Sequence, residues 1–227
     1  MELKNKVVVI TGAGRGLGKS LALILAEEGA RLVLSGKDKE HLENLKKGIG
    51  GKIFSADITD ENQVKELAKF AIKEFGRIDI WINNAGVWLP EVSIEEIDFK
   101  RVHDMFEVNV FGGMYGSREA LKQMRKQGSG IILNIISTAA LDGRKDLSGY
   151  IASKFAFNGF TKSLRDETKR ENLKILSVFP GGMKTSIFDE KRPSNFDEFM
   201  DPNEVAQKIV DNLKKDKPEE EMVIRRN

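Results

Sequence analysis

Residues 7–18 of the chain, VVVITGAGRGLG, constrain its fold more than any other stretch. Four consecutive branched apolar residues are typical of a strand buried on both faces, and the glycines after them allow a tight turn in which backbone approaches a ligand closely. Leu17, Leu21 and Leu25 then recur at helical spacing as far as Gly29. The stretch therefore predicts a strand, a glycine-rich turn and a helix whose unpaired N–H groups and positive dipole end face the turn, where a diphosphate would fit.

Two interpretations of this turn remain open. The strand before it and the helix after it favour a nucleotide site, whereas the same glycines would also serve a turn that is needed for geometry alone. A Walker-type phosphate loop is excluded, because no Gly-Lys-Ser/Thr sequence closes the turn at the required spacing.

Strand and helix patterns alternate along the whole chain. Predicted strands occupy residues 7–10, 30–35, 52–56, 78–82, 131–136, 174–179 and 222–224, and the predicted helices after the first occupy about 39–47, 60–75, 99–127 and 150–170. This alternation predicts a single α/β domain over residues 1–227, a doubly wound parallel β-sheet of the Rossmann type with helices on both faces in a three-layer sandwich. Gly112, Gly113 and Gly116 interrupt the long helix and predict close helix packing.

Composition excludes several classes of function. The chain has 40% hydrophobic and 32% charged residues and no apolar run near the length of a membrane span, so we expect no membrane segment. Its net charge is only +2, and its basic and acidic residues are interleaved, so we expect no nucleic-acid-binding surface. The first residues run straight into a strand, so we expect no signal peptide and a cytoplasmic location. There are no cysteines, and His41 and His103 lack carboxylates at metal-ligand spacing, so no metal site is predicted.

Several short motifs follow the predicted strands. They are Thr11–Gly18, Asp57, Asn83–Gly86, Ser137, Tyr150–Lys154 and Pro180–Thr185, with Asn109 inside the long helix. In this order and spacing they resemble the short-chain dehydrogenase/reductase family in its common single-domain form, and the resemblance covers most of the chain. It implies an oxidoreductase that interconverts a carbonyl and an alcohol by hydride transfer with a nicotinamide cofactor.

The resemblance implies a catalytic set of Asn109, Ser137, Tyr150 and Lys154. Tyr150 and Lys154 are one helical turn apart and share a face, and a nearby ammonium is expected to lower the tyrosine pKa from about 10 toward working pH, which makes Tyr150 the acid/base. By resemblance, Ser137 contacts the reacting oxygen and Asn109 holds a water in a relay to Lys154. Without the resemblance, Tyr150 and Lys154 would be an ordinary pair on an amphipathic helix.

The resemblance also implies a cofactor-binding set, with Asp57 on the adenine side and Thr185 facing the nicotinamide. The set is Gly12, Gly14, Arg15, Gly16, Leu17, Gly18, Lys37, Asp57, Asn84, Ala85, Gly86, Tyr150, Lys154, Pro180, Gly181 and Thr185.

The residues just after the second strand determine the cofactor preference, because an acidic side chain there binds the ribose 2′-hydroxyl of NAD and a basic side chain binds the 2′-phosphate of NADP. Gly36 stands where NAD-preferring relatives carry Asp, and Lys37 where NADP-preferring relatives often carry Arg. Arg15 supplies a second cation. These residues favour NADP(H) over NAD(H), although a lysine lacks the bidentate fork of arginine and Asp38 follows directly.

The substrate side is less well defined by the sequence. Residues 186–202, which mix apolar and charged side chains, lie where relatives place a substrate lid, and we expect a small-molecule carbonyl compound, reduced rather than formed. Trp88 either borders the substrate or covers the sheet, whereas the phenylalanines 155, 157 and 160 are expected in the core or in a dimer contact. By resemblance, helices 99–127 and 150–170 pair with a second subunit in a homodimer or homotetramer.

Two alternatives remain open. One is an NAD-dependent alcohol dehydrogenase that works in the oxidative direction. The other is a protein that binds NADP without turnover, as a sensor or scaffold.

Overall fold

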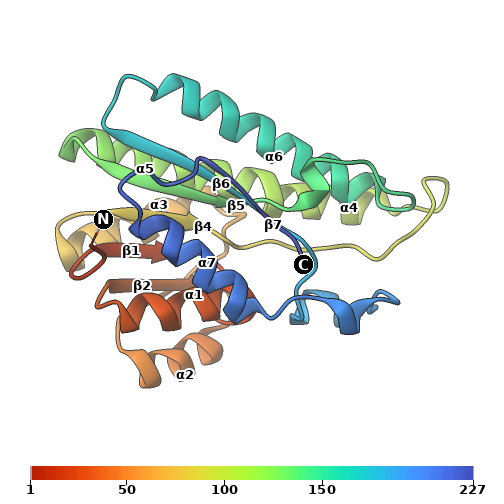
Figure 1. Cartoon of the computed structure of the whole chain (residues 1–227), viewed down its shortest axis with the longest axis horizontal. Helices are drawn as coiled ribbons and strands as arrows, with labels where there is room; N and C mark the ends of the chain where they lie inside the picture. The colour runs from red at the N-terminus through yellow and green to blue at the C-terminus, as the bar shows by residue number, and fades with distance from the viewer. Residues whose placement is uncertain (1, 227) are drawn as a thin grey trace.

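In the computed structural model, which describes residues 2–226, a seven-stranded parallel sheet forms the centre of the molecule (Figure 1). The strands are β1 (Val7–Ile10), β2 (Arg31–Gly36), β3 (Lys52–Ser55), β4 (Ile80–Asn83), β5 (Gly130–Ile135), β6 (Leu173–Pro180) and β7 (Glu221–Ile224). Their order is β3-β2-β1-β4-β5-β6-β7, so the chain changes direction across the sheet between β1 and β4. Every predicted strand is present, with bounds that differ by no more than a few residues, and the predicted doubly wound fold is confirmed.

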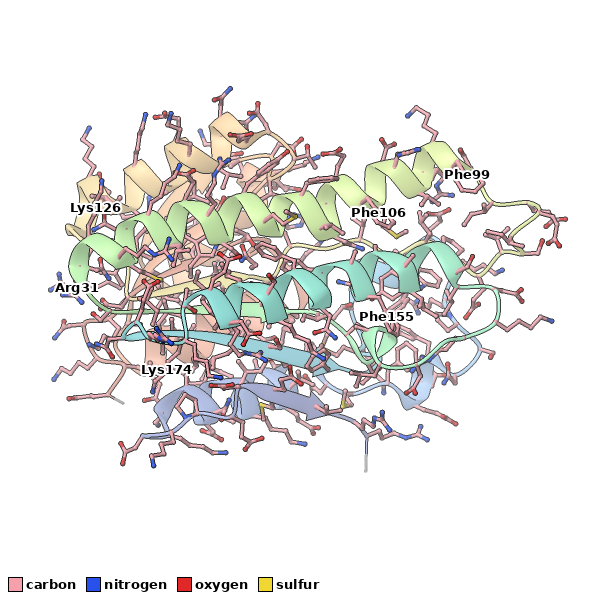
Figure 2. The ribbon with its side chains drawn as sticks, turned by 90° about the horizontal axis from the view of Figure 1, so that it is seen from above. Arg31, Phe99, Phe106, Lys126, Phe155 and Lys174 are labelled. Atoms are coloured by element: carbon pink, nitrogen blue, oxygen red, sulfur yellow. The ribbon has the colours of Figure 1, made fainter. Side chains whose placement is uncertain are left out.

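Helices cover both faces of the sheet (Figures 1 and 2). They are α1 (Gly16–Glu27), α2 (Lys39–Ile49), α3 (Glu61–Phe75), α4 (Phe99–Phe106), α5 (Gly113–Gln127), α6 (Ser148–Glu167) and α7 (Pro202–Lys214). Successive residues of a strand point to opposite faces, so Val8 and Ile10 pack with α1, α2 and α7, while Val9 packs with α3, α5 and α6. This division explains why the first strand is apolar at every position.

The predicted helix over residues 99–127 contains a π-helical segment, Glu107–Gly112, between α4 and α5. Asn109 lies in this segment and is bound on both sides of its amide, since its Oδ1 accepts from Val87 N at 2.8 Å and its Nδ2 donates to Val87 O at 2.9 Å. The packing role predicted for the glycines is confirmed: a Cβ on Gly113 would overlap the ring of Phe157, and one on Gly116 would overlap Asn83. The long helix therefore lies tightly against its neighbours.

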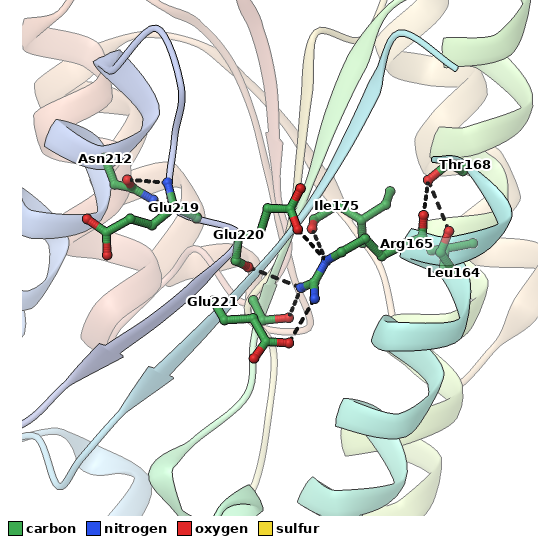
Figure 3. A network of polar contacts seen from close by, with 9 residues as sticks. Leu164, Arg165, Thr168, Ile175, Asn212, Glu219, Glu220 and Glu221 are labelled. Carbon is green, nitrogen blue, oxygen red and sulfur yellow. Dashed lines mark hydrogen bonds and ion pairs between the residues drawn. The ribbon is translucent and has the colours of Figure 1, made fainter. Parts of the chain in front are cut away.

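Arg165 joins α6 to the last two strands (Figure 3). Its guanidinium donates to Ile175 O at 3.0 Å and Ser177 Oγ at 2.9 Å on β6, and to Glu221 Oε1 at 2.8 Å on β7. On the other side of β7, Asn212 of α7 binds the backbone of Glu219 through both amide atoms. These contacts hold the edge strand β7 between α6 and α7. No helix within residues 2–226 combines the length and apolar character that crossing a bilayer requires.

Candidate active site

The glycine-rich turn between β1 and α1 has the backbone geometry of a ligand cradle. Gly12 and Gly16 adopt left-handed conformations with φ of 64° and 53°, which residues with a Cβ rarely adopt. Gly18 is required for packing, because a Cβ there would overlap the carbonyl oxygen of Gly12. The turn thus brings backbone without bulky side chains to the surface of the site, with the N–H of Ala13 bound to Ser35 O at 2.9 Å.

The N-terminus of α1 lacks the side-chain cap that other helices carry. Its N-cap residue, Arg15, makes no capping hydrogen bond, and its first turn holds no acidic residue. In contrast, four other helices are capped by aspartates, namely Asp38, Asp60, Asp98 and Asp201. The free N–H groups of α1 therefore fit the diphosphate of a dinucleotide, which would supply the missing acceptors.

The turn after β4 braces the glycine turn. Asn84 Nδ2 donates to Thr11 O at 2.9 Å and to Gly12 O at 3.1 Å, and the Thr11 hydroxyl oxygen accepts from Asn84 N at 3.0 Å and Ala85 N at 3.2 Å. Thr11 itself is buried. These bonds fix the two turns relative to each other at the carboxyl ends of β1 and β4.

A cavity of about 680 Å³ lies over these turns. All of the predicted site residues line it except Gly18, Asp57 and Asn109. Gly18 contributes to the packing of the turn rather than to the cavity wall. Asn109 lies behind Gly86, which does line the cavity: a Cβ added to Gly86 would be 3.3 Å from Asn109 Oδ1. Most of the predicted set is thus brought together around one cavity.

Asp57 does not face the cavity but pairs with Lys37, whose Nζ lies 2.8 Å from Asp57 Oδ2. Burial alone would raise the pKa of Asp57, but hydrogen bonds from Lys37 and from Thr59 outweigh it and hold the pKa below its usual value of 3.8. Asp57 is therefore a carboxylate that orients Lys37, and the cation at the end of β2 is partly neutralised.

Tyr150, Lys154 and Ser137 converge at the base of the cavity. The Nζ of Lys154 lies 5.6 Å from the centre of the Tyr150 ring, and the lysine side chain is only 6% exposed. Ser137 lies at the end of β5, where its Oγ accepts a hydrogen bond from Ala139 N at 3.0 Å. A hydroxyl, a phenol and an ammonium thus surround one point in the cavity.

The expected effect of Lys154 on Tyr150 is wrong for the protein on its own. Burial raises the pKa of Tyr150 above 10.0, while hydrogen bonding to Ser137 and the charge of Arg144 act to lower it. Burial also lowers the pKa of Lys154 to about 8. Burial is therefore the largest influence on the pKa of each group, and the charge of Lys154 is not among the influences that lower the pKa of Tyr150.

Ser153 links Asn109 to the turn of helix that carries Tyr150. Asn109 Nδ2 donates to Ser153 Oγ at 3.1 Å, and that hydroxyl donates to the carbonyl oxygen of Tyr150 at 2.7 Å. The π-helical segment is therefore tied to the first turn of α6 through buried polar groups.

Comparison with known proteins agrees with this geometry. Residues 6–195 match the family described as short chain dehydrogenase. The protein is a short-chain dehydrogenase/reductase. It is similar to an uncharacterized oxidoreductase of Staphylococcus aureus (strain N315), with 34% identity over 92% of this chain and 90% of that protein, and to one of Staphylococcus saprophyticus, with 33% identity over 97% and 94%.

Solved structures share the fold over nearly the whole length. The 3-ketoacyl-(acyl-carrier-protein) reductase of Brucella melitensis, complexed with NADH, superposes with a TM-score of 0.92 at 26% identity, covering 98% of this chain and 97% of that one. The alcohol dehydrogenase of the archaeon Thermococcus sibiricus, complexed with 5-hydroxy-NADP, gives 0.88 at 27% identity with the same coverage. The chain is therefore an oxidoreductase of a family that uses NAD(P)(H).

Aromatic rings form part of the cavity wall. Trp88 packs against Phe188 with ring centres 5.0 Å apart, and Phe188 in turn contacts Phe199 at 5.3 Å. Trp88 is 8% exposed and lines the cavity, which is compatible with either interpretation offered for it. None of the phenylalanines 155, 157 and 160 lines the cavity, as predicted.

The segment from Met183 to Met200 supplies part of the cavity wall. Met200 N donates to Gly182 O at 3.0 Å, which closes the base of the segment. Arg101 of α4 pairs with Glu190 at 2.6 Å, and Arg226 pairs with Glu198 at 2.6 Å. Ion pairs thus hold the segment to α4 and to the end of the chain.

His41 and Arg144 also line the cavity, and no sequence motif predicted a role for either residue. His41 lies in the first turn of α2, and Arg144 lies in the loop between β5 and α6. Among residues 2–226 no group of three or more His, Cys, Asp or Glu side chains is arranged to hold a metal ion.

Proposed function

We propose that this short-chain dehydrogenase/reductase reduces a carbonyl compound to an alcohol with NADPH, using Tyr150 as the general acid. The observation that carries the proposal is the convergence of Ser137, Tyr150 and Lys154 in one cavity with the uncapped helix α1. A tyrosine whose pKa is raised by burial holds its proton at neutral pH, which is the form needed to protonate a carbonyl oxygen.

Each residue has a defined part in the proposed step. The Tyr150 hydroxyl donates its proton to the carbonyl oxygen, and the Ser137 hydroxyl donates a hydrogen bond to the same oxygen as negative charge develops. Lys154 stabilises the phenolate that remains, and the bonds from Asn109 through Ser153 hold the Tyr150 turn in place. A bound nicotinamide cofactor supplies the hydride.

The proposed preference for NADPH rests on two cations. Arg15 forms no ion pair with any acidic group among residues 2–226, whereas Lys37 is already paired with Asp57 at 2.8 Å. A 2′-phosphate between them would gain more from the unpaired guanidinium than from the shared ammonium. Arg15 is therefore proposed as the stronger determinant, and the preference as moderate.

Replacing Arg15 by Gln is expected to weaken NADPH binding by about tenfold, and Lys37→Gln by only a few fold. Affinity for NADH changes by less than twofold in both, because the lost partner is the 2′-phosphate. Kd values from titrations that follow cofactor fluorescence test this. Lys39→Gln, an exposed cation outside the cavity, is the matched control. Equal losses for both cofactors would contradict the proposed role of Arg15 and Lys37.

The same titration on the unaltered enzyme, followed by a panel of carbonyl compounds, tests the function itself. Tighter binding of NADPH and its oxidation by an aldehyde or ketone are the expected results. Binding of NADH alone would favour the oxidative alcohol dehydrogenase. NADPH binding without turnover of any carbonyl would favour a non-catalytic sensor.

A homo-oligomer is proposed through the face formed by the π-helical segment and α6, which pack side by side (Figure 2). Phe111 and Phe155 on these two elements are 40% and 46% exposed, so this face presents two aromatic rings to solvent. A second copy of the chain would bury both rings.

Phe155→Glu is expected to convert the oligomer to a monomer, because it places a charge where an apolar contact forms. Size-exclusion chromatography with light scattering measures the change, and Lys208→Glu on the opposite face, on α7, is the control. A monomeric unaltered protein, or a variant that stays oligomeric, would exclude this face.

A further inference from the structure

Arg144 places a guanidinium at the reacting end of the cavity. It belongs to the loop between β5 and α6 and lines the cavity six residues before Tyr150. Its Nη2 lies 3.5 Å from the hydroxyl of Thr138, the residue that follows Ser137. Its charge also reaches the reacting group, since it acts to lower the pKa of Tyr150.

Arg144 is exposed, and no carboxylate among residues 2–226 forms an ion pair with it. The other two arginines on this side of the cavity are paired, Arg225 with Asp142 at 3.6 Å and Arg226 with Glu198 at 2.6 Å. One guanidinium near the reacting atoms is thus left to bind an anion that the protein itself does not provide.

The loop that carries Arg144 is held on both sides. Val92 N donates to Asp146 O at 2.9 Å, which ties the loop to the segment after β4, and the ion pair between Asp142 and Arg225 ties it to the end of the chain. Asp146 has a φ of 60°, a left-handed conformation that aspartate tolerates better than most residues. Arg144 therefore approaches the cavity from a defined backbone.

The cavity that Arg144 lines also has apolar walls. Trp88, Leu147 and Phe188 are among its lining residues, and the acidic Glu91 also lines it without an ion pair among the described residues. Such a site suits a short carbon chain with one polar end, because the rings exclude water from the chain while a guanidinium binds a carboxylate through two parallel hydrogen bonds.

We propose that the carbonyl substrate carries a carboxylate a few bonds from its carbonyl group, and that Arg144 binds this carboxylate. The substrate class is an oxo acid, reduced to the corresponding hydroxy acid. This inference rests on the proposed function and adds a specificity-determining residue to it. The carboxylate on Arg144 and the carbonyl oxygen at Ser137 and Tyr150 together fix which carbon faces the cofactor.

Two pairs of probes test the proposal: acetoacetate with methyl acetoacetate, and 4-oxopentanoate with its methyl ester. The unaltered enzyme is expected to show a kcat/KM for each acid at least about tenfold above that of its ester. Arg144→Gln is expected to lower kcat/KM for the acids by about 10- to 100-fold and for the esters by less than threefold. Lys145→Gln, the neighbouring exposed cation outside the cavity, leaves both unchanged.

A binding measurement separates failure of this inference from failure of the proposed function. In a Tyr150→Phe background that carries bound NADPH, the Kd of each acid is measured from cofactor fluorescence with and without Arg144→Gln. An increase of about tenfold in Kd supports the inference even where turnover of these probes is slow. Equal rates or affinities for acids and esters, unchanged by Arg144→Gln, would overturn the proposed binding of a carboxylate by Arg144. The proposed carbonyl reductase function would still stand if the enzyme reduced any carbonyl compound.

Discussion

Tyr150→Phe is expected to lower carbonyl reduction by about 10³-fold, because it removes the hydroxyl that gives its proton to the reacting oxygen in the proposed step. The ring remains, and the hydroxyl contributes little to binding of the cofactor, so the Kd for NADPH changes by less than twofold. NADPH oxidation followed at 340 nm, together with a fluorescence titration, measures both quantities.

The chain provides a matched control for this substitution. Its other tyrosine, Tyr115, lies on α5 outside the cavity, so Tyr115→Phe removes a phenol hydroxyl with no loss of activity. Circular dichroism spectra of both variants establish that they fold. Turnover retained by Tyr150→Phe would show that another group protonates the substrate, and the proposed mechanism would then be wrong.

Much of this site could be predicted because its signals are local. The four apolar residues of β1 divide between the two faces of the sheet, which is why a continuous run rather than an alternating one marks a parallel strand. Gly12 and Gly16 need positive φ, and Tyr150 and Lys154 need one helical turn between them. Each of these requirements is satisfied within a few residues of sequence.

The parts that escaped prediction depend on contacts between distant segments. The π-helical segment is fixed by the two bonds between Asn109 and Val87, and the apolar periodicity of the helix does not register the extra residue in that turn. The pairing of Lys37 with Asp57 joins the ends of two neighbouring strands, although each residue had been assigned to the cofactor separately. Arg144 lies in an irregular loop, where no pattern indicates which side chain turns inward.

The pKa of Tyr150 shows a second reason why the sequence alone does not predict the chemistry of the site. Spacing along a helix establishes that Lys154 is near, but the balance between the attraction of two charges and their loss of water depends on how deeply the cavity buries them. In this protein burial dominates for both residues. A correct motif thus led to the wrong direction for a pKa.

Lys154→Met is expected to stabilise the fold while abolishing activity. Burial lowers the pKa of Lys154 from 10.5 to about 8, so below pH 8 the folded protein must hold an ammonium that the unfolded chain exposes to water. At about 1.4 kcal/mol per pH unit, this difference corresponds to a cost of about 3 kcal/mol at pH 7. Methionine fills the same space without the charge, so the free energy of unfolding is expected to rise by about that amount.

The dependence on pH identifies the cause of the effect. The folded state gives up its proton near pH 8 and the unfolded chain near 10.5, so the cost is full below pH 8 and fades as the pH rises to 10.5. Urea unfolding of the cofactor-free protein is therefore expected to separate the variant from the unaltered enzyme at pH 7 and to bring them together at pH 10.5. Lys162→Met, an exposed lysine on the same helix, changes stability at neither pH.

Equal stability of the Lys154→Met variant and the unaltered enzyme at pH 7 would mean that other groups compensate the ammonium, and the explanation from burial would fail. The expected rise in the free energy of unfolding of Lys154→Met would instead show that the ammonium of Lys154 destabilises the folded protein. Hydrogen bonds join Asn109 and Ser153 to the first turn of α6, which carries Tyr150 beside Lys154, and no group among residues 2–226 forms a hydrogen bond with the ammonium of Lys154. A lysine kept at such a cost is explained by what it does for a bound cofactor and for the phenolate of Tyr150, because it contributes nothing to the stability of the chain itself.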